Sequence, residues 1–217
     1  GSHLVSPRSL EFSVMSNQSA TPHSETELAR TRATDVSCPE IAWDGIADCR
    51  RCAVRQQALF SALRGSDFDQ FFVPVRSAVV RAGTVLYTQN AAADAIYSVR
   101  WGVVKLVKEA PEESPRIVRL LGHGAALGLE ALKEGVYWHT AIALGETGLC
   151  RIPFQVVDQL QARNPLVADR LILQWERHLA YADRWITELS TGPVSGRVQR
   201  LIELLVEITG RGGEIDL

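Results

Sequence analysis

The sequence has little of what marks secreted, membrane-spanning or nucleic-acid-binding proteins. Its 217 residues include four cysteines and one methionine, and aromatic residues make up only 7%. No apolar run approaches the roughly 20 residues that span a bilayer, and no secretory signal is visible. The formal net charge is -2, so the chain as a whole has no basic excess that would attract nucleic acid. We therefore expect a cytoplasmic protein without membrane contact or structural disulfides, whose cysteines stay reduced and able to bind metal.

The chain is long enough for one substantial core, with 46% hydrophobic residues, but its first part does not contribute to that core. Residues 1–14 (GSHLVSPRSLEFSV) precede the single methionine and are typical of a leader left by an expression vector. Residues 15–48 are rich in Ser, Thr and charge without periodicity, which predicts a mobile arm that carries Cys38. Residues 49–72 hold a Cys-x-x-Cys and predict one or two short helices broken at Gly65.

Residues 73–163 predict a β domain. Runs such as TVLYTQ, AIYSVRWG, VVKLVKE and GLCRIP are β-branched or alternating, and Gly or Pro separates them at close intervals. Many short strands at this spacing favour an antiparallel sandwich or barrel over alternating strands and helices. We interpret Trp101, Arg116 and Arg119 in these strands as ordinary core and solvated surface.

A long helix is predicted at residues 164–191. Asn164 and Pro165 suit an N-cap and a first helical turn, and Gly192-Pro193 ends the helix. Its apolar residues recur at alternating steps of four and three, which is the a/d seam of a coiled coil and calls for a partner helix. The members of this seam are Ala168, Ile172, Trp175, Leu179, Ala182, Ile186 and Leu189.

We therefore predict a homodimer through this helix. The line formed by Leu171, His178 and Trp185 is expected to lie on the β domain instead. The alternative is a single amphipathic helix that packs on its own domain, which normally shows a wider apolar stripe.

Several motifs resemble the CRP/FNR family of bacterial transcription regulators. The segment AGTVLYTQNAAADAIYSVRWGVVKLV is similar to the family pattern Gly-x-x-Leu-Phe…Tyr-x-Ile-x-x-Gly-x-Val-x-Leu, with Gly83, Tyr97 and Gly102 on its turn and strand positions. The segment GLEAL resembles the sequence before the family's effector loop. In GLCRIPF, Cys150 stands where FNR-like members have a cysteine ligand on the barrel. Gln89-Asn90 departs from the family's usual Gly-Asp turn, which matters little to the fold.

The resemblance implies a mainly β plus α fold: a double-stranded β-helix (jelly-roll) sensor domain of the cyclic-nucleotide-binding kind, followed by a long coiled-coil dimerisation helix. Residues 193–217 resemble the start of a winged helix-turn-helix domain, but no recognition helix follows, and specific DNA readout needs that helix. We expect the sensor and dimerisation part of a regulator, truncated before the recognition helix. DNA and RNA polymerase would be partners of the full-length protein only.

The resemblance makes cyclic nucleotide the first effector to consider. Members that bind it use a Gly-Glu-Leu turn and an Arg-Ser or Arg-Thr pair, in which the guanidinium meets the phosphate. Here Leu129 stands in place of the glutamate, and His139-Thr140 stand in place of the Arg and its hydroxyl neighbour. An apolar Leu and a neutral His cannot replace an Arg fork, so this effector pocket is not expected to hold a cyclic nucleotide.

The resemblance implies instead a [4Fe–4S] cluster that responds to oxygen or nitric oxide. Four thiolates can hold such a cluster or a zinc ion, and the chain offers Cys38, Cys49, Cys52 and Cys150. The family places a third N-terminal cysteine about six to eight residues after its Cys-x-x-Cys, where this chain has Leu59 and Phe60, so Cys38 would have to substitute.

Two alternatives stay open. Cys49 and Cys52, flanked by arginines, would form a redox switch if they were exposed thiols of low pKa. A haem-based gas sensor would use His123, His139 or His178 as an axial ligand. An enzyme is not expected, because the β domain has neither the His-x-His pair of jelly-roll oxygenases nor a nucleophile with a base.

Overall fold

The computed structural model describes the core of the chain and leaves out its two ends. The described residues are 41–56, 59–64, 67, 74–111 and 114–209. Cys38, residues 15–40 of the predicted arm, the predicted helix break at Gly65 and residues 210–217 therefore lie outside the described residues. The end of the predicted arm, residues 41–48, is described, and its Gly45 and Ile46 pair as a strand with Ser77 and Arg76.

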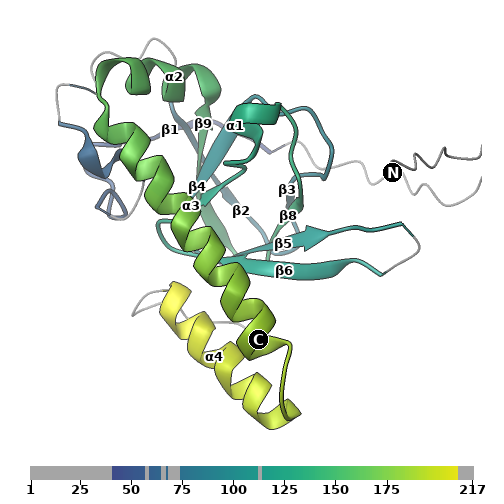
Figure 1. The fold of residues 1–217 in the computed structure, drawn as a ribbon. Helices are drawn as coiled ribbons and strands as arrows, with labels where there is room; N and C mark the ends of the chain where they lie inside the picture. The colour runs from purple at the N-terminus through teal and green to yellow at the C-terminus, as the bar shows by residue number, and fades with distance from the viewer. Residues whose placement is uncertain (1–40, 57–58, 65–66, 68–73, 112–113, 210–217) are drawn as a thin grey trace, which may run out of the picture. The chain divides into compact units, whose positions relative to one another are not determined.

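Two antiparallel sheets form the β domain (Figure 1). One has the strand order β1-β2-β9-β4-β7 and the other the order β3-β8-β5-β6. Their bounds are β1 Gly45–Ile46, β2 Arg76–Val80, β3 Val85–Tyr87, β4 Ala95–Trp101, β5 Val104–Lys108, β6 Arg116–Leu121, β7 Ala126–Leu127, β8 Thr140–Ala143 and β9 Thr147–Pro153. The predicted jelly-roll fold is confirmed.

The two sheets enclose an apolar core. Val99 of β4, Leu106 of β5 and Leu149 of β9 are at most 2% exposed and belong to one cluster, to which three tyrosines add a stack. Tight turns join the strands. Gly102 has a φ of 86° and a Cβ there would lie 2.8 Å from the Cα of Thr147, so this turn needs glycine on both counts. Asn90 takes a φ of 65°, which asparagine tolerates better than most residues.

A second apolar cluster lies on the outer face of the five-stranded sheet. Ile96 of β4 and Cys150 and Ile152 of β9 point to this face, because side chains two residues apart on a strand share a face. A 3₁₀ turn, Leu59–Ala62, and the helices α2 (Phe154–Arg163) and α3 (Leu166–Arg184) cover it. The short helix α1 (Ala131–Glu134) lies in the loop between β7 and β8.

Helix α3 begins where the sequence predicts, because the side chain of Asn164 accepts a hydrogen bond from the backbone N–H of Leu166 (3.1 Å). Its inner face is buried on the β domain through Val167, Leu171, Gln174 and His178. A π-helical segment, Trp185–Leu189, extends it. No helix among the described residues is long and apolar enough to cross a membrane.

Helix α4 (Val194–Thr209) folds back beside the end of α3 and contacts the β domain (Figure 1). Leu204 and Ile208 pack with Val103 and Leu120, and the N–H of His123 donates to the carbonyl of Ile208 (2.9 Å). Arg184 of α3 also pairs with Glu207 (2.7 Å). The two helices are therefore tied to each other and to the turn after β6.

Candidate functional site

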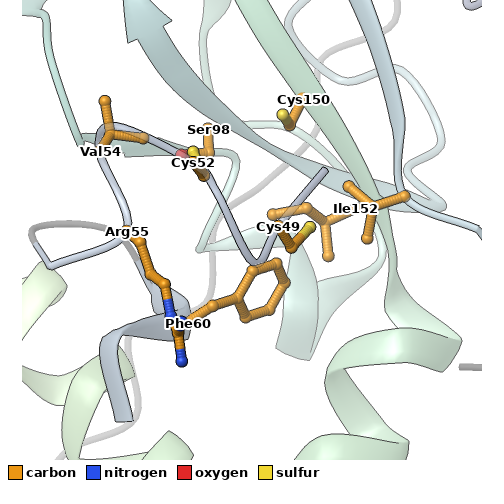
Figure 2. A pocket seen from close by; sticks show the side chains of 9 residues that line it. Cys49, Cys52, Val54, Arg55, Phe60, Ser98, Cys150 and Ile152 are labelled. Carbon is orange, nitrogen blue, oxygen red and sulfur yellow. The ribbon is translucent and has the colours of Figure 1, made fainter. Parts of the chain in front are cut away.

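Three cysteines that are far apart in the sequence line one pocket on the outer face of the five-stranded sheet. Figure 2 shows Cys49 and Cys52 from the segment between β1 and β2 and Cys150 from β9 around this hollow. The pocket holds about 340 Å³ of empty space, part of it open to solvent. Apart from these thiols, its wall consists of apolar side chains together with Ser98 and Arg55.

Hydrogen bonds within the segment shape the turn that carries two of the thiols. One carboxylate oxygen of Asp48 accepts from the backbone N–H groups of Arg50 and Arg51 (3.2 Å each), and the other accepts from Nε of Arg51 (2.9 Å). The N–H of Arg55 then closes a turn on the carbonyl of Cys52 (3.1 Å). An aspartate that binds the backbone two and three residues further on is the usual Asx turn, so the local sequence sets this geometry.

Burial controls the chemistry of the thiols. Desolvation, with the neighbouring Cys150 as a smaller cause, raises the pKa of Cys49 from 9.0 to about 12. Desolvation likewise raises the pKa of Cys150 from 9.0 to about 11, while the positive charge of Arg100 opposes the shift. The expectation that flanking arginines give Cys49 an exposed thiol of low pKa is therefore wrong, because Cys49 is half-buried and packs against an apolar cluster. This weakens the redox-switch alternative.

The three cysteines are suitable ligands for a metal bound by thiolates, but in the described residues they are not arranged as a finished metal site. Within residues 41–209, so far as they are described, no three His, Cys, Asp or Glu side chains lie close enough together to hold a metal ion. The sulfurs face one pocket, yet they would have to move closer to become ligands of one group. Leu59 and Phe60, where the family has its third N-terminal cysteine, are buried in the outer apolar cluster.

Side chains of this protein occupy the positions of the predicted effector pocket. Leu129 is 1% exposed and belongs to the outer apolar cluster. Nδ1 of His139 lies 3.5 Å from a carboxylate oxygen of Glu130. The hydroxyl of Thr140 accepts from the N–H of Gln89 (3.0 Å). These three residues thus serve the protein's own packing and hydrogen bonding.

A buried polar network connects this region to α3. Arg119 of β6 lies between two histidines, with Nη2 3.2 Å from Nε2 of His139 and Nη1 3.3 Å from Nδ1 of His178. The interpretation of Arg119 as solvated surface is therefore wrong. Arg119 shares a face of β6 with the buried Leu121, but Leu120 on the other face is also apolar and buried, so alternation gave no signal that Arg119 points inward.

The charges in this network shift one another's pKa values. Desolvation, with the neighbouring Arg119 as the second cause, lowers the pKa of His178 from 6.5 to about 4. Burial alone would raise the pKa of Glu130, but hydrogen bonds from His139 and from backbone N–H groups outweigh it and lower that pKa. Arg119 therefore faces two imidazoles and the Glu130 carboxylate, which supplies the balancing negative charge.

The histidines proposed as haem ligands are not gathered around the described pocket. His139 and His178 are both bonded to Arg119, and Nδ1 of His123 lies 3.1 Å from the backbone carbonyl of Arg100. One ring nitrogen of each buried imidazole is thus hydrogen-bonded to Arg119, and neither imidazole lines the pocket. The haem alternative therefore gains no support.

The predicted seam of α3 is partly exposed. Ile172, Leu179 and Ile186, seven residues apart, are 57%, 63% and 64% exposed. The opposite line is buried at Leu171 and His178, as predicted. Leu189 departs from the prediction, because it is buried on the β domain and α4 within its own chain. The remaining seam members are half-buried: Ala168, Trp175 and Ala182.

Comparison with known proteins gives one consistent family. The cyclic nucleotide-binding domain family matches residues 78–164. Transcriptional activator protein Anr of Pseudomonas protegens is 24% identical over 168 residues, which are 76% of this chain and 69% of Anr. Among solved structures, the catabolite activator protein of Thermus thermophilus matches with a TM-score of 0.50 and 28% identity, over 61% of this chain and 62% of that one.

One enzyme also shows similarity, over a small part of its length. Lysophospholipase nte1 of Aspergillus fumigatus is 33% identical over 113 residues, which are half of this chain but only 7% of the enzyme. The similarity therefore extends to one domain of that protein. The fold, the cyclic nucleotide-binding domain and the likeness to Anr and to the catabolite activator protein agree with one another, and together they support a CRP/FNR-type regulator.

Proposed function

We propose that this chain is the sensor and dimerisation part of a transcription regulator that responds to oxygen or nitric oxide through a [4Fe–4S] cluster. Cys49, Cys52 and Cys150 would ligate the cluster, with Cys38 as the fourth thiolate. When bound, such a cluster would supply an oxygen-labile centre that needs its four sulfur ligands. DNA and RNA polymerase would be partners of the full-length protein, and the site of action would be the cytoplasm.

The observation that carries this proposal is the common pocket of the three cysteines (Figure 2). Cys49 and Cys150 have 100 residues between them in the sequence, yet they line the same pocket, and Cys150 is one of the causes that raise the pKa of Cys49. A buried thiol of raised pKa is a poor nucleophile but a good metal ligand once it loses its proton, because the apolar wall keeps competing water away. Arg55 lines the pocket, and the charge of Arg100 favours the thiolate form of Cys49 and Cys150, so both would offset the negative charge of the thiolates.

Contacts within the described residues offer a path from this pocket to α3. Phe60 lines the pocket and belongs to the outer apolar cluster together with Leu59 and Leu63. Val167 and Leu171 of α3 are members of the same cluster. A shift of the cysteine segment on losing its ligand would therefore disturb the inner face of α3.

The outer face of α3 would carry the response. Ile172, Leu179 and Ile186 recur every seven residues on the exposed side, as a two-helix coiled coil requires. Burying such side chains in a partner helix would stabilise a dimer by about 1.5–3 kcal/mol each. If the packing of the inner face of α3 became looser, the exposed residues Ile172, Leu179 and Ile186 would pack less well against the partner helix. The state of the pocket would in this way affect dimerisation.

A single substitution tests the assignment of the ligands. Cys150→Ser should abolish iron retention in protein purified without oxygen, because a serine oxygen is a poor substitute for a thiolate on iron. The matched control is Ser77→Ala, since Ser77 pairs with Cys150 across β2 and β9 but does not line the pocket. A Cys150→Ser protein that keeps its full iron and sulfide content would refute the proposal.

A further inference from the structure

Ser98 of β4 presents a buried hydroxyl to the cysteine pocket that no other described group satisfies. Ser98 is 6% exposed, and its Oγ has no hydrogen-bond partner among the described residues. The residue nevertheless lines the pocket of the three thiols, as Figure 2 shows. Leaving a buried hydroxyl unpaired costs about 1–3 kcal/mol, so such a group calls for an explanation.

The strand register places Ser98 beside one particular cysteine. Ser98 and Cys150 are directly opposite each other on β4 and β9, and residues in this relation have their side chains on the same face of the sheet. The rest of the pocket wall offers a hydroxyl donor little to bind, because most of its residues are apolar and Arg55 carries only donors. Among the side chains that line the pocket, the three thiols are thus the remaining candidate acceptors, and none of them is hydrogen-bonded to the hydroxyl in this structure.

We propose that the Ser98 hydroxyl donates a hydrogen bond to the sulfur at the Cys150 position when the pocket holds its metal group. This inference rests on the proposed function and adds a residue to it. A protonated thiol is a weak acceptor, whereas a metal-bound thiolate carries negative charge and accepts strongly. The hydroxyl therefore gains its partner only in the loaded protein.

Such a bond sets how easily the site is oxidised. Hydrogen bonds to cluster sulfurs are one of the factors that fix the reduction potential, since they stabilise the more negative, reduced state. Ser98 would thus slow the loss of the cluster in air and set the oxygen threshold of the sensor. It is a positioning and tuning residue, while the thiolates remain the ligands.

The test compares Ser98→Ala, Ser98→Thr and the control Ser77→Ala with the wild-type chain, all purified without oxygen. Iron and sulfide content should be equal in all four. After exposure to air, the visible absorption of Ser98→Ala should bleach about tenfold faster, which is the worth of a hydrogen bond to a charged acceptor. Ser98→Thr keeps the hydroxyl and should bleach slowly, as should Ser77→Ala.

Metal-free protein gives a second readout. Thermal unfolding of metal-free Ser98→Ala should occur at the wild-type temperature or above it, because the substitution removes an unpaired buried hydroxyl. A clear drop would mean that the hydroxyl has a partner in the protein itself and would overturn the inference. Equal bleaching of Ser98→Ala and the wild-type chain would overturn it as well, with the proposed function intact. A wild-type chain that binds no iron would instead remove the proposed function, and the inference with it.

Discussion

Low pH should lower the stability of the folded protein through protonation of His178, and the size of the effect follows from the structure. The side chain is 3% exposed, and burial together with Arg119 lowers its pKa from 6.5 to about 4. Glu130 and His139 are the other titratable groups that act on it. Because the folded-state pKa lies below the unfolded value, the unfolded chain binds the proton first as the pH falls. The stabilisation is complete above pH 6.5 and is lost on the way down to about pH 4.

The magnitude follows from the two pKa values. A difference of about 2.5 pKa units, at about 1.4 kcal/mol each, corresponds to roughly 3 kcal/mol in full and to about 2 kcal/mol between pH 7 and pH 4.5. That is a large part of the 5–15 kcal/mol that usually separates folded from unfolded protein. The network that joins β6 to α3 should therefore be a main acid-labile point of the fold.

Urea unfolding at fixed protein concentration measures this effect. The wild-type chain and His178→Gln are compared at pH 7 and pH 4.5, because glutamine stays neutral and can still bond to Arg119. Other carboxylates titrate equally in both proteins, so the difference isolates His178. We expect the advantage of the wild-type chain to shrink by about 2 kcal/mol at the lower pH. Parallel losses of stability in the two proteins would refute the reasoning from burial.

Two further changes probe the helices. A double variant with Asp at Ile172 and Ile186 should be a monomer in light scattering, because two carboxylates cannot be buried in a coiled-coil seam. Asp at the exposed Val79 of β2 is the control and should leave the dimer intact. A double variant that remains dimeric would count against the seam. Gly122→Ala should destabilise the docking of α4 by about 1–3 kcal/mol, since a Cβ would lie 2.1 Å from a carbonyl oxygen of α4. Hydrogen exchange should then speed up in α4 but not in the strands, and unchanged exchange in α4 would contradict the contact.

The fold was largely predictable because its local signals agree with one another. Alternating runs separated by glycine gave the strands, and the left-handed turns at Gly83 and Gly102 fall where the family pattern places them. Asn164 caps α3 as predicted. In α3 the period of the apolar residues separated the buried line through Leu171 from the exposed line through Ile172. It failed at Leu189, because α4 folds back and covers that position, which no pattern inside α3 could indicate.

The sequence predicted that Cys49, Cys52 and Cys150 gather at one place, which the common pocket bears out, but it did not predict the surroundings of these thiols. Cysteine is rare in this chain, so the thiols stood out, and the motif around Cys150 linked them to one place. The raised pKa of Cys49 depends on what covers it in three dimensions, and the flanking arginines suggested the opposite direction. Ser98 and Arg119 looked like ordinary strand residues, because only the pairing of strands reveals that one faces the thiols and the other faces two histidines.

The most direct test of the central claim is the iron and acid-labile sulfide content of the chain purified without oxygen, with its visible spectrum before and after exposure to air. The account predicts about four irons and four sulfides per chain and a brown colour that bleaches in air. A colourless protein that is free of iron and keeps all its thiols would contradict the account.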